Sequence, residues 1–353
     1  MSQFVRSLVV VAVLSACAGN APAPAPVPVP TPIPAPPPVA TPAPRPVKPS
    51  VPPAESSLPR SSEAAMQPGL PAPVVAFPPM RSGSTAQWIL WDNQRRNYWL
   101  RVPRGYDGKT ALPLVIVLHA RGSSAQAAHL LGFNQKADAA GFIAVYPEAL
   151  GAPRIWNAGH DRGASNADDS GYIQGLVTTV RTSLNVDPRR IYLVGHSSGG
   201  MMAYRVAAES SYGFAAVGAI GAAVGSRDRA GAVNIIAPRM PVSVMHIHGR
   251  LDRTVPYAGG RSATIVGADY LGVPDAAELW TKTNGCAGAP RTSQVGNISR
   301  DVYADCSSGS HVEIVSITNG GADWPGLLRI DPRQKQNAID VLWDFFSVHQ
   351  RGS

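Results

Sequence analysis

Continuous runs of branched apolar residues alternate with stretches of helical spacing from Met80 to the end of the chain. Such runs suit strands that are buried on both faces of a parallel sheet, because half-exposed strands alternate apolar with polar residues. The strands that we expect are Tyr98–Pro103, Leu112–His119, Phe142–Tyr146, Ile191–Val194, Phe214–Ile220, Val242–His248 and His311–Ile317. The helices that we expect are Ala125–Ala139, Ser170–Leu184, Gly199–Glu209, Asp275–Thr283 and Gln334–His349. The alternation predicts one α/β domain over residues 80–353, with a mainly parallel sheet and helices on both faces.

The first 17 residues have the pattern of an export signal. One cation, Arg6, precedes the apolar run Leu8–Leu14, which is too short to span a bilayer. The signal ends in Leu-Ser-Ala-Cys17, which resembles a bacterial lipobox and predicts lipidation of Cys17. The alternative is a chance cysteine in a leader. If the anchor is real, Ala18 after the cysteine implies sorting to the outer membrane, and otherwise the chain is secreted.

Residues 18–79 are expected to form a spacer without a core. Proline occupies 17 of the 40 positions from Ala21 to Arg60, and proline lacks the backbone donor that helices and sheets need. In polyproline II geometry such a stretch could extend over about 120 Å. The spacer would hold the folded domain away from a membrane.

Cys286 and Cys306 are the other two cysteines. In an exported chain we expect them to form a disulfide, and the alternative is two buried thiols. Neither has the CxxC or HxxxH neighbours of a metal site, so we expect no metal. The formal charge of +8 is spread without a basic run, which indicates solubility or attraction to an anionic envelope surface and argues against nucleic-acid binding.

Gly195-His-Ser197-Ser-Gly199 follows the expected strand Ile191–Val194 and precedes a helix-like stretch. In this strand, turn and helix context, G-x-S-x-G is typical of a nucleophile elbow. The turn would expose the Ser197 hydroxyl at the positive end of a helix dipole. A purely structural glycine turn is the alternative. We interpret Ser197 as a nucleophile.

Asp252 lies just past the expected strand Val242–His248, in the stretch His248-Gly-Arg-Leu-Asp252-Arg-Thr-Val-Pro-Tyr257. An acid in this place follows the serine in the chain order Ser, Asp, His, and it would orient a histidine base. A lone loop aspartate is more often a turn residue. In this setting we interpret Asp252 as the catalytic acid.

These stretches, together with Trp156-Asn157, Asp187–Tyr192, Trp280–Cys286 and Gly320–Gly326, resemble the secreted polyhydroxybutyrate depolymerase-like and feruloyl esterase family. The resemblance covers nearly all of residues 90 to 350. It implies an α/β-hydrolase fold and serine hydrolysis of carboxylic esters without a cofactor. The substrates it implies are hydroxyalkanoate oligomers or acylated polysaccharide and aromatic esters. It also implies an oxyanion hole from the backbone amides of Ser198 and Arg121.

The last loop departs from the family pattern. The family has Gly-Gly-His-x-Trp-Pro-Gly, and this chain has Gly-Gly-Ala322-Asp323-Trp324-Pro-Gly. Without the imidazole no base receives the proton of Ser197, so activity is expected to be very low. Asp323 is a weak base. Of the other histidines we keep only His160, in a loop, as a substitute base.

Milder expectations concern the surroundings of the site. Ala120 replaces a family glycine and would strain its loop if that position needs a positive φ. The expected pocket walls are Trp156, Asn157, Tyr257 and Trp324, with ordinary packing as the alternative. The pair Asp168-Asp169 is interpreted as a helix cap and a loop tie.

Three hypotheses about activity follow from Ala322. The chain is an esterase scaffold whose histidine was replaced to trap a substrate, a natural pseudo-esterase that binds ligand at the envelope, or a working enzyme that uses another base. A mere envelope spacer is the remaining class without catalysis.

Overall fold

A computed structural model describes residues 82–159, 164–210, 213–235, 237–323, 329–331 and 336–352. The chain divides into two compact units, Met1–Leu70 and Pro71–Ser353, and every described residue belongs to the second. The expected signal with Cys17, the spacer of residues 18–79, His160 and Trp324 lie outside the described residues.

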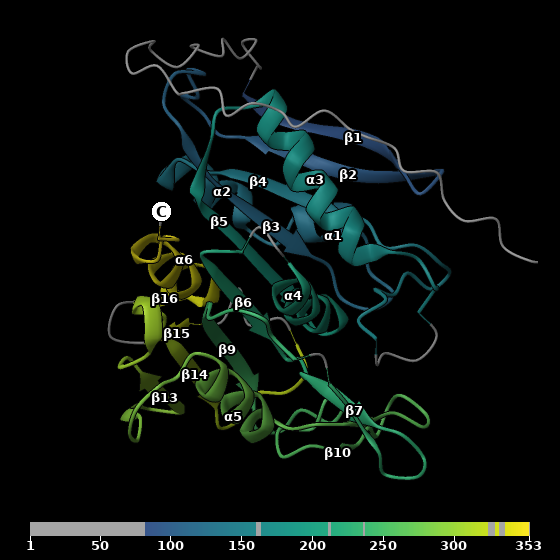
Figure 1. The fold of residues 1–353 in the computed structure, drawn as a ribbon, viewed down its shortest axis with the longest axis vertical. Helices are drawn as coiled ribbons and strands as arrows, with labels where there is room; N and C mark the ends of the chain where they lie inside the picture. Colours follow the sequence, from purple (N-terminus) through teal and green to yellow (C-terminus); the bar gives the residue numbers. More distant parts are fainter. Residues whose placement is uncertain are drawn as a thin grey trace, which may run out of the picture. The chain divides into compact units, whose positions relative to one another are not determined.

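A ten-stranded sheet forms the centre of the described unit, in the order β1-β2-β4-β3-β5-β6-β9-β14-β13-β12 (Figure 1). The middle strands from β4 to β14 are parallel, and the outer ones on both sides are antiparallel. The strands are β1 (Gly83–Trp91), β2 (Gln94–Val102), β3 (Leu112–Leu118), β4 (Ile143–Pro147), β5 (Val186–His196), β6 (Ala216–Ile220), β9 (Ser243–Gly249), β12 (Arg291–Val295), β13 (Ile298–Tyr303) and β14 (Val312–Ile317).

Helices cover both faces of this sheet, as the sequence predicts. They are α1 (Ala125–His129), α2 (Phe133–Ala140), α3 (Asp169–Ser183), α4 (Ser198–Glu209), α5 (Val273–Thr283) and α6 (Ala338–Val348). On β3, Leu114 and Ile116 belong to the same core cluster as buried residues of α3, α4 and α5, whereas Val115 and Val117 belong to the cluster that includes α1, α2 and α6. Successive strand residues point to opposite faces, so a continuous apolar run serves two cores at once. The predicted α/β architecture is confirmed.

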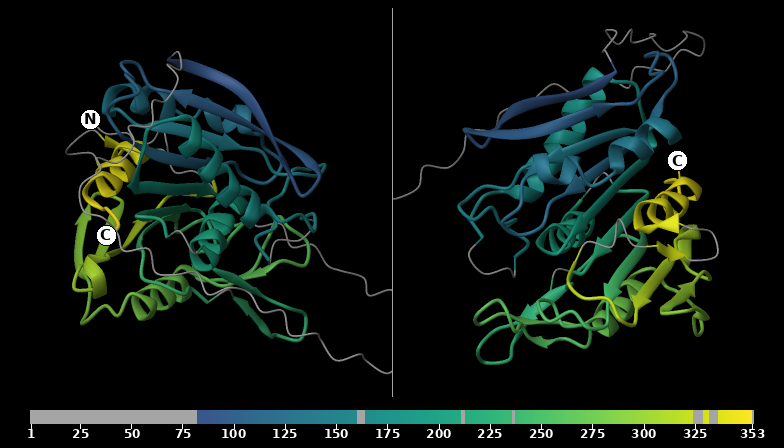
Figure 2. Two further views of the ribbon diagram at one scale, coloured as in Figure 1. Left: turned by 45° about the horizontal axis from the view of Figure 1, so that its top comes forward. Right: turned by 180° about the vertical axis from the view of Figure 1, so that it is seen from behind.

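The edges differ from the expectation. The sequence predicts one helix over Ala125–Ala139, but it is broken into α1 and α2 at Gly132, whose φ is 102°. The strands β1, β12 and β13 were not expected. Their residues are largely exposed or only partly buried, so their composition lacks the apolar runs of the central strands. In Figure 2 the dark-blue hairpin of β1 and β2 lies at one margin of the sheet.

Two small sheets complete the described unit. The larger has the order β10-β11-β7-β8, from β7 (Gly225–Arg227), β8 (Val233–Ile235), β10 (Gly260–Arg261) and β11 (Asp269–Tyr270). Its strands come from the segments that follow β6 and β9. The smaller pairs β15 (Arg329–Asp331) with β16 (Gln336–Asn337).

Cys286 and Cys306 form the expected disulfide. It joins the end of α5 to the segment after β13, so it fastens the outer antiparallel strands to a helix of the core. Within the ranges that the structure describes, no helix is both long and apolar enough to cross a membrane.

Candidate active site

Ser197 lies at a sharp turn between β5 and α4, with φ 54° and ψ −122°. Such a backbone is uncommon for a residue with a side chain, and it is a recognised place for stored strain at functional sites. The Ser197 amide donates to the Ile220 carbonyl of β6 at 2.8 Å, and the Met201 amide donates to the Ser197 carbonyl at 3.0 Å. These bonds fix the turn between the sheet and the helix.

The two glycines that flank Ser197 are required by close backbone approaches. A Cβ on Gly195 would overlap the carbonyl of Gly199, and a Cβ on Gly199 would overlap the carbonyls of Leu118 and His119. The elbow therefore packs against the end of β3, where residues 119–122, which we call the oxyanion loop after their expected role, begin. The lack of room for a Cβ explains why the G-x-S-x-G pattern has glycine at positions 195 and 199.

Ser198, the residue after the expected nucleophile Ser197, is the first of α4 and is almost fully buried. An amide at the first helical position has no acceptor within its own helix, so it can serve an oxyanion. The Ser198 hydroxyl is buried without a hydrogen-bond partner among the described residues.

The oxyanion loop after β3 turns at Gly122, whose φ is 71°, and not at Ala120, whose φ is not positive. The condition under which alanine would strain this loop is therefore not met. The Gly122 amide donates to the Arg154 carbonyl at 2.8 Å, which removes that amide as an oxyanion donor. The role of the Arg121 amide stays a prediction.

Asp252 follows β9 and its side chain is 1% exposed. Its Oδ1 accepts the amides of Thr254 at 2.8 Å and Val255 at 2.9 Å, while its Oδ2 lies 3.4 Å from His248 Nε2. A Cβ placed on Gly221 would lie 3.6 Å from Asp252 Oδ2 and 3.7 Å from a ring nitrogen of His196. The carboxylate therefore reaches the neighbourhood of the elbow.

A chain of buried polar side chains runs from α4 to this carboxylate. The Tyr204 hydroxyl lies 2.6 Å from His246 Nδ1, His246 Nε2 lies 2.9 Å from His248 Nδ1, and His248 Nε2 lies 2.8 Å from the Val255 carbonyl. Because a carbonyl only accepts, His248 Nε2 carries a proton; with neutral rings, His246 Nε2 donates to His248 and Tyr204 donates to His246. Burial holds the pKa of His246 well below its usual value, which keeps that ring neutral.

The segment with Ala322 lies against both the acid loop and the elbow. The Leu251 amide donates to the Gly320 carbonyl at 2.9 Å, and His196 Nε2 donates to the Ala322 carbonyl at 3.0 Å. Ser197, Asp252 and Ala322 thus belong to three segments that meet at the carboxyl ends of β5, β9 and β14. Residue 322 is alanine, so its side chain is a methyl group at the position where the family pattern predicts an imidazole.

A hollow of about 160 Å³ lies beside this position. Its lining includes Gly221, His248, Gly249, Gly321 and Asp323. The lining comes from the ends of β6 and β9 and from the loop that carries Ala322. The space is therefore enclosed by the same segments that present the acid.

The other histidines of the described residues have structural contacts. His119 is buried, with Nδ1 donating to the Ala120 carbonyl at 2.8 Å and Nε2 accepting the Ala149 amide at 3.0 Å. Burial lowers the pKa of His119 to about 4, so it is neutral near pH 7. Burial also lowers the pKa of His196. Both rings use a nitrogen to hold a loop in place.

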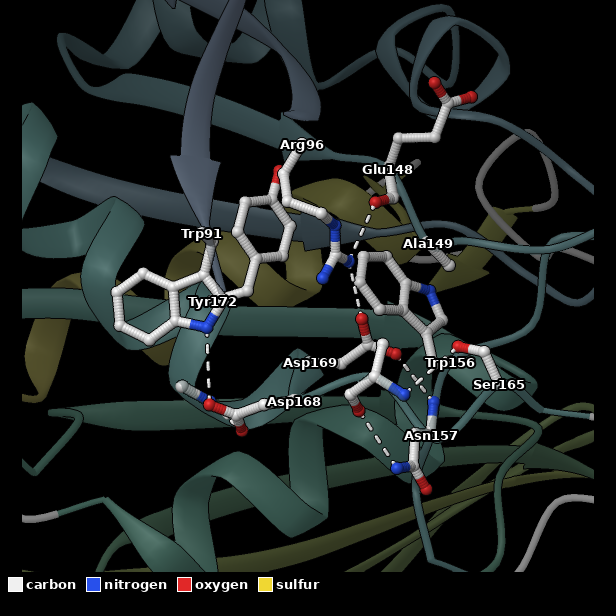
Figure 3. Close-up of polar contacts among 12 residues, drawn as sticks. Trp91, Arg96, Glu148, Ala149, Trp156, Asn157, Ser165, Asp168, Asp169 and Tyr172 are labelled. Carbon is white, nitrogen blue, oxygen red and sulfur yellow. Dashed lines mark hydrogen bonds and ion pairs between the residues drawn. The ribbon is translucent and has the colours of Figure 1, made fainter. Parts of the chain in front are cut away.

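An ion pair that was not expected supports the loop beside the site (Figure 3). Arg96 is 2% exposed, and its guanidinium donates to Asp169 Oδ1 at 2.5 Å and to the Glu148 carbonyl at 3.2 Å. It also lies 3.9 Å from the centre of the Tyr172 ring. Asp169 Oδ2 accepts the Asn157 amide at 2.8 Å. A single arginine in a polar strand gave no sign of burial, so the sequence could not identify Arg96.

The expected pocket walls are placed differently from one another. Trp156 is fully buried, and its indole donates to the His119 carbonyl at 2.9 Å. It can therefore support residues that line a pocket, but its own side chain is not at the surface. Asn157 is partly buried and binds Arg205 through its carbonyl at 2.7 Å. The hydroxyls of Tyr257 and Ser316 are 2.7 Å apart, in contact with the acid loop. Ligand contact by these residues stays a prediction. Asp168 caps α3, and Asp169 ties the loop, as interpreted from the sequence.

The fold and the site together define a class. A mainly parallel sheet of this strand order, a serine on a strained turn into a helix, and an acid after a later strand are those of an α/β-hydrolase. The chain belongs to the esterase PHB depolymerase family, whose model matches residues 96–276.

Relatives with assigned names agree with this family. The chain is 29% identical over 237 residues to feruloyl esterase B of Piromyces equi, an alignment that covers 64% of this chain and 42% of the relative. It is 25% identical over 286 residues to feruloyl esterase D of Neurospora crassa, covering 76% and 87%. The chain thus spans less than half of the first relative's length.

A solved structure shares the fold. The acetyl xylan esterase from Aspergillus awamori superposes with a TM-score of 0.50 and 14% identity, covering 74% of this chain and 99% of that one. At this identity the likeness concerns the fold alone.

Proposed function

We propose that the chain binds carboxylic esters at Ser197, in a site built for serine hydrolysis whose base position is occupied by Ala322. The observation that carries this proposal is the strained turn at Ser197, whose neighbour His196 bonds to the Ala322 carbonyl and lies near the buried Asp252 carboxylate. Ser197 is the nucleophile and Asp252 is the acid. The Ser198 amide and a donor of the oxyanion loop, for which Arg121 is our candidate, receive the carbonyl oxygen.

The geometry supports binding and polarisation of the ester carbonyl better than the proton transfers that hydrolysis needs. The start of α4 favours negative charge on the ester oxygen as the serine oxygen bonds to the carbonyl carbon. The proton of Ser197 must leave as this bond forms, and the residue at the expected base position, Ala322, cannot accept it. Loss of the base in a comparable triad lowers kcat by about a millionfold. We therefore expect ester binding with very slow turnover.

The substrate class follows from the relatives. Two of them are named feruloyl esterases, and an acetylxylan esterase of Coprinopsis cinerea is 30% identical over 145 residues. These names favour acyl groups on polysaccharide, and the family description keeps hydroxyalkanoate oligomers as the alternative. The second candidate function is that of a pseudo-esterase, a binding protein of the envelope, which Ala322 itself favours.

The proposed location is the cell envelope or the surroundings of the cell. The signal-like first residues and the lipobox at Cys17 support export and a lipid anchor, with the spacer of residues 18–79 between anchor and domain. The disulfide between Cys286 and Cys306 fits an oxidising compartment.

The experiment that tests the proposal is hydrolysis of p-nitrophenyl acetate and methyl ferulate by the chain and by Ala322→His, each with and without Ser197→Ala. We expect Ala322→His to raise turnover by several orders of magnitude and Ser197→Ala to abolish the gain. Equal activity of the chain and of Ala322→His, both dependent on Ser197, would mean that another base acts. His160 would then be the next residue to replace.

A further inference from the structure

The edge strand β1 exposes two large apolar side chains. Trp88 is 54% exposed and Leu90 is 63% exposed, and both lie on β1, the outermost strand of the sheet. Exposed apolar side chains on an edge strand invite unwanted pairing, and natural proteins usually place charges or proline there. A retained apolar patch at such a place indicates a binding surface.

A hollow of about 240 Å³ lies beside this patch. The lining residues that concern recognition are Gln87, Trp88, Arg95, Asn97, Trp99 and Glu148. We call this hollow the hairpin groove. It combines aromatic surface with amide, guanidinium and carboxylate groups, and this combination offers both apolar contact and hydrogen bonds.

The indole of Trp88 is held in position by its neighbours. The Arg95 guanidinium lies 4.9 Å from the centre of the Trp88 ring, and Arg95 Nε donates to Asn97 Oδ1 at 3.2 Å. Asn97 is directly opposite Trp88 in the pairing of β1 with β2. A ring fixed in this way loses little entropy when a ligand packs against it.

The strand register places the hairpin groove at the same edge of the sheet as Ser197. Gln87 pairs with Tyr98, and Tyr98 pairs with Pro147 at the end of β4. The register of β4 with β3 and of β3 with β5 brings this row to Gly195. Trp88 lies one residue beyond the row, and Ser197 lies two residues beyond it on the same side.

The lateral distance follows from the strand order. Four strand spacings separate β1 from β5 (Figure 1). With about 4.8 Å per spacing, Trp88 and Ser197 are about 19 Å apart along this edge. A ligand that occupies both places must be an extended chain.

The hairpin groove is also joined to the oxyanion loop. Glu148 forms an ion pair with Arg154 at 2.8 Å, and the Arg154 carbonyl accepts the Gly122 amide at 2.8 Å. The surface between Trp88 and Ser197 is therefore built from segments that contact each other.

We propose that the hairpin groove is a distal subsite for the polysaccharide chain that carries the ester. One sugar ring would pack its C–H face on the indole of Trp88, and its hydroxyls would bond to Asn97 and Glu148. These polar groups favour a sugar over a polyester, which has no hydroxyl donors along its chain. This inference deepens the proposed function and rests on it.

The first test measures binding and needs no turnover. The full chain and its variants are run in native gels that contain soluble arabinoxylan, and the retardation is compared with gels that lack it. We expect Trp88→Ala to weaken binding about tenfold, because the stacked ring is lost. Trp88→Phe should keep most of the binding, and Val348→Ala, an exposed apolar residue of α6, should keep all of it.

Retardation of Trp88→Ala equal to that of the parent would overturn the subsite. The same holds if Trp88→Ala loses binding to poly(3-hydroxybutyrate) granules but not to arabinoxylan, since the occupant would then be a polyester. Asn97→Ala is a second variant, so the question stays answerable if Trp88→Ala does not fold.

The second test uses the Ala322→His background with feruloylated arabinoxylan and p-nitrophenyl acetate as substrates. Trp88→Ala should raise the KM for the polymer about tenfold and leave the small ester unchanged. Equal losses on both substrates would contradict a distal subsite. If Ala322→His shows no serine-dependent hydrolysis while Trp88→Ala still weakens retardation, the proposed catalytic function fails and the sugar-binding surface remains.

Discussion

The Nε2 atom of His248 lies 3.4 Å from Oδ2 of Asp252, at a point where both side chains are almost completely buried. Since His248 Nε2 also donates to the Val255 carbonyl, the imidazole lies between the acid and its own loop. The carboxylate of Asp252, our proposed acid, therefore lies beside the end of a buried hydrogen-bond chain that runs from Tyr204 through His246 to His248.

The first prediction concerns this positioning. In the Ala322→His background, His248→Phe should lower kcat/KM by roughly 10- to 100-fold, because a contact to a charged group contributes about 1.5–3 kcal/mol. Tyr204→Phe should lower stability and leave kcat nearly unchanged, since it removes only the far end of the chain. Steady-state kinetics together with urea unfolding separates the two effects. Unchanged kcat/KM in His248→Phe would show that Asp252 does not need this neighbour.

The second prediction concerns the hollow of about 160 Å³ beside Ala322. A cavity of about 150 Å³ can hold benzene, so this hollow, which is lined by the residues on either side of Ala322, has the volume for an imidazole. Added imidazole should accelerate ester hydrolysis by the unmodified chain, with saturation as the hollow fills. Ser197→Ala measures the background reaction of free imidazole. A linear, unsaturated increase that is the same in both proteins would contradict rescue at this position.

The third prediction concerns pH and His119. Its pKa is about 4 in the folded chain and near 6.5 when unfolded, so the unfolded state binds the proton first as the pH falls. The contribution of His119 to the free energy of unfolding is complete above pH 6.5 and is lost between pH 6.5 and 4. It amounts to about 3 kcal/mol in total. The free energy of unfolding should therefore fall by about 3 kcal/mol less in His119→Gln over this range. The free energies of unfolding of the two proteins are measured by urea titration from pH 7 to 4. If both fall by the same amount, the low pKa of His119 is refuted.

The fourth prediction concerns the disulfide, which closes a loop with a sequence separation of 20 residues. Its removal in the double variant Cys286→Ser, Cys306→Ser should lower the free energy of unfolding by about 3 kcal/mol, through greater freedom of the unfolded chain. A reducing agent should reproduce the loss in the parent and have no effect in the variant. Denaturant titrations with and without reductant provide the measurement.

The sequence by itself determined the class of the fold and the local structure of the turn at Ser197. Continuous apolar runs such as Leu114–Leu118 can only be buried from both sides, and the glycines around Ser197 fit only a turn without room for side chains. The same local logic identified the helix cap at Asp168 and the pairing of Cys286 with Cys306. These features depend on residues that are close in the chain or chemically restricted.

Tertiary structure alone decided what surrounds the chemistry. Arg96 and Asp169 are 73 positions apart, and nothing local distinguishes a buried arginine from an exposed one. The chain from Tyr204 to Asp252, the full burial of Trp156 and the shared edge of Trp88 and Ser197 likewise depend on strand order and register. Contacts between distant segments arise from packing in three dimensions, and sequence spacing does not encode which strand becomes the neighbour of which.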